Sequence, residues 1–332
     1  MNYIGSKHSL LNFIDSVVLE FTDNHNRNVV ISDLFAGTGA VGAFFRSKGH
    51  KIIANDIQYY SYIINYNAIR NKKNHLDKLE YLNSLDGFDG FIYKNYCAGS
   101  GSGRLYFSDE NGRKCDAIRT EIERMKVANE ITDAEYYAYL AALIEAIDKV
   151  ANTASVYGAF LKQLKKSAQK PVVLVPLAVA EGPVGDVYNE NANQLIQRIT
   201  GDILYVDPPY NARQYASNYH ILETIARYDS PEIHGKTGLR DTAEQKSKYS
   251  SKRTVEQEFE DLIKNAKFKV ILLSYNNEGL MSADVVKAIM SKYGQYSLRK
   301  KEHRRFRADK IDNRNHKTGG TTEYLHILEK TK

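Results

Sequence analysis

The sequence predicts an α/β protein built on an open, mostly parallel sheet. Four short runs rich in apolar and β-favouring residues are typical of buried strands, and they span residues 29–35, 49–54, 202–206 and 269–274. Helix-like segments follow the first two runs, which is the rhythm of parallel strands joined by helices. Residues 296–307 and 323–329 predict two last strands, and an antiparallel hairpin there would close the sheet.

The most informative stretch is residues 202–210, where an apolar strand ends at two adjacent prolines. Pro208 and Pro209 have a fixed φ and no N–H, and each also restricts the residue before it, so Asp207 is held in one arrangement. In open α/β sheets, ligands bind beyond the carboxyl ends of the strands. The corner therefore predicts a rigid polar pocket, although an ordinary strand and turn explain a proline pair alone equally well.

The tetrapeptide Asp207-Pro208-Pro209-Tyr210 resembles the catalytic motif of S-adenosylmethionine-dependent amino-group methyltransferases, in its adenine-N6 form. The adenine amine is a poor nucleophile because its lone pair is delocalised into the ring. The resemblance implies that the Asp207 carboxylate and the Pro208 carbonyl accept its two N–H groups and align it for in-line attack. Such a base must be flipped out of the duplex, and stacking on Tyr210 would return roughly 1–3 kcal/mol.

Residues 3–7 and 36–39 carry a second part of the resemblance, to the D12 class of adenine methyltransferases. The first segment precedes an amphipathic pattern over residues 10–21 that predicts a helix, with Ser6 as its cap. In that class, Tyr3 and Lys7 would lie against the cofactor. The second segment contains Gly37 and Gly39, which permit a tight turn and close approach of backbone N–H groups to a ligand at a helix N-terminus.

Two acidic residues flank the glycine turn. Asp33 resembles the residue that handles the methionine ammonium, and Asp56, 19 residues after Gly37, is placed to accept both ribose hydroxyls. A dinucleotide would be bound by the same logic, so only the Asp-Pro-Pro-Tyr corner selects methyl transfer. The resemblance adds four further cofactor contacts: Asp207, Phe35, Ile57 and Asn191. The family usually has an acidic residue at the last position, and an amide there can still bond the cofactor adenine.

The α/β rhythm is lost between about residues 71 and 182, which predicts an inserted domain. The catalytic domain would then comprise residues 1–70 and 183–332. In the D12 class the target-recognition domain lies in this interval. The resemblance thus implies a Rossmann-like class I methyltransferase fold with a largely helical, DNA-binding insertion. A Gly-Ser loop at 99–103 precedes strand-like residues 104–107 and supplies no helix N-terminus, which favours a flexible loop over a phosphate site.

Basic and aromatic residues are the candidate DNA contacts. The net charge is +6, and residues 299–317 hold nine Lys/Arg against three Asp/Glu, which suits a polyanion, although solvated basic faces are common. The candidates are Tyr157, Lys162, Lys165, Lys166, Arg213, Tyr215, Lys246, Lys248, Arg304 and Arg305. Core packing is an equally good explanation for Tyr157 and Phe160, and His220 is expected to face the core rather than to act as a base.

Composition excludes several classes of protein. The two cysteines have no metal-ligand spacing, so the sequence predicts neither a disulfide framework nor a metal site, and it fits a reduced cytoplasmic location. The longest apolar run, 172–180, is broken by Pro176 and is shorter than the roughly 20 residues that cross a bilayer.

Motif order along the whole chain predicts a site-specific adenine-N6 methyltransferase that uses S-adenosylmethionine and acts on double-stranded DNA. A cognate restriction endonuclease would be its functional partner, unless it is a solitary modification enzyme; the oligomeric state is not predicted. One alternative is an amine in RNA or a protein amide as substrate. Another is a DNA-binding subunit that has lost catalysis, against which the intact Gly37, Gly39 and Asp207 speak.

Overall fold

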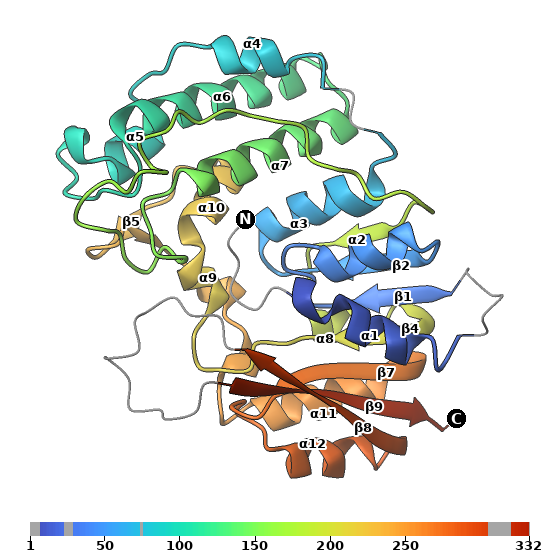
Figure 1. Cartoon of the computed structure of the whole chain (residues 1–332). Helices are drawn as coiled ribbons and strands as arrows, with labels where there is room; N and C mark the ends of the chain where they lie inside the picture. Colours follow the sequence, from blue (N-terminus) through green and yellow to red (C-terminus); the bar gives the residue numbers. More distant parts are fainter. Residues whose placement is uncertain (1–6, 23–28, 74–75, 305–319, 332) are drawn as a thin grey trace. The chain divides into compact units, whose positions relative to one another are not determined.

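The computed structural model describes residues 7–22, 29–73, 76–304 and 320–331, and it divides into two compact units (Figure 1). The sheet unit comprises 7–57, 181–214 and 246–332, and the helical unit comprises 58–180 and 215–245, apart from the residues outside the described ranges. Three of the predictions above, for Tyr3, Ser6 and Arg305, lie outside the described residues, as does the side chain of Arg304.

The sheet unit contains, in its described part, a seven-stranded sheet in the order β3-β2-β1-β4-β7-β9-β8. Its strands are β1 (Val30–Asp33), β2 (Lys51–Asn55), β3 (Asp186–Tyr188), β4 (Thr200–Val206), β7 (Lys267–Asn276), β8 (Gly294–Arg304) and β9 (Gly320–Lys330). The first five strands in this order are parallel, and β9 runs antiparallel to both β7 and β8. The predicted class I methyltransferase architecture, a mostly parallel sheet closed by an antiparallel hairpin, is confirmed.

The strand order and register show which residues lie at the ligand-binding edge of the sheet. The strand order reverses between β1 and β4, and this switch point is where open α/β sheets bind ligands. Asp33 is the last residue of β1 and pairs with Tyr205 of β4. Asn276, the last residue of β7, pairs with Glu323 near the start of β9. The antiparallel return therefore brings Glu323 to the same edge as the carboxyl ends of the parallel strands.

Helices cover the sheet with their apolar sides. They are η1 (His8–Leu10), α1 (Leu11–Val18), α2 (Ala40–Ser47), α8 (Ala192–Leu195), η5 (Lys248–Ser250), α11 (Val255–Asn265) and α12 (Ala283–Met290). In α1 the buried residues are Ile14, Val17 and Val18, as the i, i+3, i+4 spacing predicts. Strand β4 is buried on both faces from Ile203 to Val206, as is usual for an internal strand of a parallel sheet.

The helical unit has a separate hydrophobic core, rich in tyrosine. Its elements are α3 (Tyr59–Asn65), the π-turn η2 (Tyr66–Arg70), α4 (Leu79–Ser84), α5 (Phe91–Tyr96), η3 (Ala98–Ser100), α6 (Asp109–Val127), α7 (Asp133–Lys149), α9 (Tyr215–Asn218), α10 (His220–Arg227), β5 (Ile233–His234), β6 (Leu239–Arg240) and η4 (Ala243–Gln245). Both cysteines, Cys97 and Cys115, are free and buried in this core.

The two compact units divide the chain at 57/58 and 180/181, whereas the predicted domain boundaries lie at 70/71 and 182/183. Helix α3 packs on α7 and α10 and belongs to the helical unit, which also takes in residues 215–245. The buried carboxylate of Glu223, on α10, fixes this arrangement because the backbone N–H groups of Tyr59 and Tyr60 donate to it at 3.1 Å each. A carboxylate at a helix N-terminus satisfies N–H groups that have no partner within the helix.

The segment after the Gly-Ser loop also differs from its prediction. Residues 104–107 form no strand, and only Phe107 makes an isolated bridge, to Cys97. The loop before them is tied to the same residue, since Ser100 Oγ and Ser102 Oγ donate to the Cys97 carbonyl at 2.7 and 2.9 Å. The backbone of the segment bonds outside any strand, since Tyr106 N donates to the Tyr96 carbonyl at 3.0 Å and the Tyr106 carbonyl accepts from Asn152 N at 2.7 Å. Within the described ranges, no helix is both long and apolar enough to span a membrane.

Candidate active site

Three ionisable side chains, Lys7, Asp207 and Glu323, meet where β4 ends. Asp207 directly follows β4, and its Oδ1 lies 3.0 Å from Lys7 Nζ. The same ammonium lies 3.4 Å from Oε1 of Glu323, and Lys7 is only 8% exposed. Ser274 Oγ donates to Glu323 Oε1 at 2.7 Å. Lys7 therefore bridges two carboxylates that come from distant parts of the sequence.

The charges of this group depend on one another. Burial raises the pKa of Asp207 to about 6; the nearby Glu323 adds to the rise and Lys7 opposes it. For Lys7, burial alone would lower the pKa, but the carboxylates of Asp207 and Glu323 outweigh it and the pKa is raised. At neutral pH the site therefore holds a charged ammonium next to a carboxylate that is mostly ionised.

The surroundings of Asp33 disfavour its ionised form. Burial raises its pKa well above the usual value, and the carboxylates of Asp207 and Asp56 raise it further. Its Oδ1 is buried without a hydrogen-bond partner in the described structure. A buried carboxylate is costly unless a cation or hydrogen-bond donors satisfy it. The free oxygen fits a ligand that brings a cationic group to this point.

The glycine turn joins β1 to α2 and is tied to β2. Gly37 and Gly39 have φ values of 51° and 75°, in the left-handed region that favours glycine, and Gly39 is the N-cap of α2. The backbone N–H of Gly37 donates to Asp56 Oδ2 at 2.8 Å. Asp56 follows β2, so the predicted turn and the predicted ribose acceptor lie in contact.

These residues fit S-adenosylmethionine, which carries an ammonium, a sulfonium and a ribose. The unsatisfied Asp33 oxygen matches an ammonium, Asp56 offers a carboxylate beside the glycine turn, and the carboxylates outnumber the Lys7 cation. The ring of Phe35 is partly buried and packs edge-to-face on Tyr249, with centroids 5.1 Å apart, while Ile57 is also partly exposed.

Two predicted cofactor residues have other contacts in the structure. Lys7 pairs with Asp207 and Glu323 rather than standing free toward a ligand. Asn191 is the N-cap of α8, and its Oδ1 accepts from the backbone N–H groups of Asn193 and Gln194 at 2.9 and 3.3 Å. Asparagine is among the strongest N-caps, so this oxygen is engaged in helix capping. The contact of Asn191 with the cofactor adenine stays a prediction, and the same oxygen would have to serve the cap as well.

Tyr210, the last residue of the proline corner, is held by the turn between β7 and α12. Its carbonyl accepts from Leu280 N at 2.9 Å, and its partly buried ring packs edge-to-face on Tyr275, with centroids 6.5 Å apart. The Tyr275 hydroxyl in turn accepts from Met281 N at 3.4 Å. The aromatic side chain thus has a packed support on one side.

Glu323 and Ser274 were missed by the sequence reasoning. The available signal was a charged residue at the start of the apolar run 323–328, where a strand of the closing hairpin was expected. The sequence alone can show that Glu323 is an unusual charge at the start of a strand. It cannot show that Glu323 pairs with Lys7, which lies more than 300 residues away, because the fold brings the two together.

The candidate DNA contacts fall into three groups. Lys162, Lys166, Arg213 and Lys246 are exposed, whereas Tyr215 is partly buried and stacks on Tyr219. Lys165 Nζ donates to the Thr153 carbonyl at 2.7 Å, and Lys248 Nζ pairs with Glu258 at 2.7 Å, so both have partners within the protein.

Tyr157 is a correction among these candidates. It is fully buried, its hydroxyl donates to Asp148 Oδ1 at 2.9 Å, and it packs on Tyr106 and Tyr219 in the core of the helical unit. It has no surface for DNA in this structure. His220 is buried in the same core, with Nε2 3.2 Å from the Tyr157 carbonyl, and burial lowers its pKa to about 4. It is thus neutral, as expected for a core histidine.

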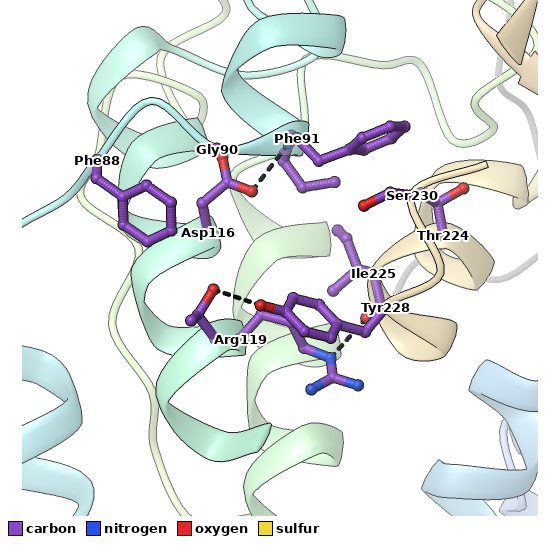
Figure 2. Close-up of a pocket in the computed structure, with 11 residues that line it drawn as sticks. Phe88, Gly90, Phe91, Asp116, Arg119, Thr224, Ile225, Tyr228 and Ser230 are labelled. Atoms are coloured by element: carbon purple, nitrogen blue, oxygen red, sulfur yellow. Dashed lines mark hydrogen bonds between the residues drawn. The ribbon is translucent and has the colours of Figure 1, made fainter. Parts of the chain in front are cut away.

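The helical unit also has a cavity of about 120 Å³ between α6 and the end of α10 (Figure 2). Arg119 lines it, but Nε donates to the Ile225 carbonyl at 2.9 Å and the Nη atoms donate to Glu123 and Tyr136. Asp116 accepts from two backbone N–H groups of α5, at 2.9 Å each. The charged groups of this cavity are thus used by the fold.

The sheet order and the edge that gathers the glycine turn, Asp33, Asp56 and Asp207 define a class I methyltransferase that uses S-adenosylmethionine as its methyl donor. Within that class, the chain belongs to the D12 class of N6 adenine-specific DNA methyltransferases, whose family model matches residues 3–291. It is therefore an enzyme, and DNA is its substrate.

Named relatives agree with this family. Type II methyltransferase M.NlaIII of Neisseria lactamica is 53% identical over 335 residues, which cover 100% of both chains. Type II methyltransferase M.CviAII of Paramecium bursaria Chlorella virus 1 is 37% identical over 93% of each chain. Type II methyltransferase M.FokI of Planomicrobium okeanokoites is 40% identical over 93% of this chain, which spans only 50% of that relative.

Proposed function

We propose that this enzyme methylates N6 of an adenine flipped out of a specific site in duplex DNA, with Asp207 and the Pro208 carbonyl accepting the two amino hydrogens. The observation that carries the proposal is the position of Asp207, at the switch-point edge of the sheet, in the same charge group as Asp33 and Asp56. The family to which the chain belongs supplies the reaction.

Each residue at this edge of the sheet has a separate role in binding the cofactor or the base. Asp33 binds the methionine ammonium, Asp56 accepts the ribose hydroxyls, and Gly37 and Gly39 let the backbone approach closely. Phe35 and Ile57 complete the cofactor site. The bound cofactor supplies an electrophilic methyl group on a sulfonium. Asp207 and Pro208 draw the adenine N–H bonds out of conjugation and align the nitrogen, which is catalysis by positioning and preorganised charge.

Pro209 and Tyr210 act on the base as a whole. Pro209 stiffens the corner, and Tyr210 stacks on the extruded ring, with its own ring packed on Tyr275 and its backbone carbonyl bound by the Leu280 N–H. Unstacking a base costs a few kcal/mol, and one aromatic contact returns roughly 1–3 kcal/mol. Contacts to the DNA backbone must therefore contribute the rest.

Tyr210→Ala is expected to weaken the complex with flipped DNA about tenfold or more, whereas Tyr210→Phe keeps the ring and loses much less. The measurement is fluorescence of 2-aminopurine at the target position, which rises when the base leaves the stack, titrated against each variant. Equal losses in both variants would contradict stacking and would leave the hydroxyl as the group that matters.

We assign target recognition to the helical unit, including the predicted insertion 71–182, with Lys162, Lys165 and Lys166 along the DNA backbone. Arg213, Tyr215, Lys246, Lys248, Arg304 and Arg305 are the further proposed contacts. The exposure of Lys162, Lys166, Arg213 and Lys246 supports this assignment. Lys248 would first have to leave Glu258.

Affinity for DNA is expected to fall steeply with salt because each phosphate contact releases a counterion. Lys162→Gln and Lys166→Gln should each lower the slope of log K against log salt by about one, at any DNA sequence. Lys126→Gln is the control. Lys126 lies in the last turn of α6 and already pairs with Asp133 within the protein, so its loss should leave the slope unchanged. A slope that is unchanged in both test variants would remove these lysines from the interface.

The biological context is a restriction-modification system, in which a cognate endonuclease cuts the unmethylated site. The names of the relatives, all type II methyltransferases in the three cases given above, support this assignment. Tritiated methyl transfer to unmodified DNA, followed by nucleoside analysis, tests the reaction directly, and sequencing of methylated DNA from expressing cells identifies the site. Transfer to RNA alone, or tight DNA binding without transfer, would overturn the proposal.

A further inference from the structure

We propose that Glu323 is a positioning residue for methyl transfer. When the adenine amino group binds Asp207, it displaces the Lys7 ammonium from that carboxylate, and Glu323 then holds the ammonium. This inference rests on the proposed function, because it requires that the Asp207 carboxylate accept hydrogen bonds from the target base. Glu323 acts through Lys7 and touches neither substrate.

The starting observation is that the proposed catalytic oxygen already has a partner. Lys7 Nζ lies 3.0 Å from Asp207 Oδ1, in a site where the Lys7 side chain is 9% exposed and that of Asp207 is 17% exposed. Hydrogen bonds between two ionised groups are roughly twice as strong as neutral ones. A neutral adenine N–H therefore displaces the ammonium from this oxygen only if Lys7 keeps another anionic partner.

Glu323 is placed to be that second partner. Its Oε1 lies 3.4 Å from the same Nζ, so Lys7 can shift toward it without leaving the buried site. Ser274 Oγ donates to this oxygen at 2.7 Å from the neighbouring strand β7, and Ser274 is 2% exposed. The carboxylate is thus oriented by a rigid strand pair before any substrate arrives.

Among the described residues, Lys7 is the cation that lies against Glu323. Lys301 pairs directly opposite Glu323 in the β8–β9 register, but its ammonium lies 5.6 Å from the centre of the Phe13 ring. A buried carboxylate costs free energy unless it is paired, and strand β9 is otherwise apolar from Leu325 to Leu328, apart from His326.

Glu323→Gln tests the inference because it removes the charge and keeps the shape and the bond to Ser274. Lys7 then remains on Asp207, so the single-turnover rate of transfer is expected to fall about tenfold, while the dissociation constant of S-adenosylmethionine changes little. Glu329→Gln, at an exposed position of the same strand, is the matched control and should keep the rate of the unaltered enzyme.

The pH dependence of the single-turnover rate distinguishes a positioning role of Glu323 from general damage to the fold. The groups that face Asp207 are Lys7, Asp33, Tyr205, Tyr210 and Glu323. Removing the negative charge of Glu323 lowers the pKa of Asp207, so the acidic limb of the single-turnover rate should move to lower pH even as the plateau falls. Damage to the fold would lower the plateau without this shift.

A double-mutant cycle with Lys7→Met closes the test. If Glu323 acts through Lys7, Glu323→Gln has no further effect in the Lys7→Met background, and Glu323→Asp restores part of the rate in the native background. Should Glu323→Gln not fold, Ser274→Ala, which removes the orienting hydroxyl, takes its place with a smaller expected loss. An unchanged rate and acidic limb, or additive effects in the cycle, would overturn this inference and leave the role of Asp207 intact.

Discussion

Asp207→Ala is expected to reduce the rate of methyl transfer by about 10³-fold or more while S-adenosylmethionine still binds. The substitution removes the acceptor that we propose for the adenine amine, and losing one preorganised hydrogen-bonding group from a catalytic site commonly costs 10²- to 10³-fold. It also leaves Lys7 with Glu323 as its remaining carboxylate partner in the described structure. Single-turnover transfer to unmodified DNA and calorimetric titration with the cofactor measure the two quantities.

Asp207→Asn is the matched control for that experiment. The amide keeps an oxygen that accepts one adenine N–H, and it releases Lys7 from its charged partner, so we expect a rate between those of the alanine variant and the unaltered enzyme. Near-normal turnover of the alanine variant would remove Asp207 from the mechanism. Loss of cofactor binding as large as the loss of rate would instead make it a cofactor residue.

Asp33→Asn is expected to weaken S-adenosylmethionine binding about 10- to 100-fold, since a hydrogen bond to a charged group contributes roughly 1.5–3 kcal/mol. The same change should stabilise the ligand-free protein at neutral pH. Burial raises the pKa of Asp33, so the folded state holds its proton more tightly than the unfolded state does. The stability that this provides is complete below the unfolded pKa and is lost as pH rises toward the folded value. The gain in Tm of the asparagine variant should therefore grow with pH.

Asp202→Asn is the control, because the change in protein stability is expected to have the opposite sign. Asp202 lies at the start of β4, at the other end of the sheet, where it accepts from Val30 N at 2.9 Å and pairs with Lys269 Nζ at 2.9 Å. Burial tends to raise its pKa, but these two partners outweigh that and lower it, so its charge stabilises the fold at neutral pH. This variant should bind cofactor normally with a lowered Tm. A lowered Tm and unaltered affinity in Asp33→Asn would contradict a cofactor role for Asp33.

The motifs predicted the sheet edge well because each depends on local backbone constraints. Two adjacent prolines end a strand wherever it lies, and glycines at positive φ turn a strand into a helix N-terminus in any α/β sheet. The contact of the Gly37 N–H with Asp56 was predictable from the same reasoning, since both follow neighbouring parallel strands. The order of these motifs along the chain was enough to predict the family.

The structure gives several of the predicted residues local roles that the motifs did not indicate. Asn191 was assigned to the cofactor adenine, which stays a prediction, and the structure adds that its oxygen caps the short helix α8. Tyr157 was assigned to DNA, but a tyrosine whose hydroxyl has a buried carboxylate partner packs fully in the core. The helical unit begins before the predicted boundary at residue 71 because the Glu223 carboxylate, far along the chain, binds the N-terminus of α3.

By itself, the sequence determined the mostly parallel sheet with its closing hairpin, the family, the methyl donor and the adenine amine as the reacting group, because these depend on short segments whose residue types have few other uses. Only the tertiary structure decided that Lys7 binds Asp207 and Glu323 together, since an ion pair is defined by distance in space and these three residues lie on three separate parts of the chain. The antiparallel return of β9 beside β7 is the physical reason: it carries a carboxylate from near the end of the chain to the carboxyl edge of the parallel strands, where the chemistry is proposed to occur.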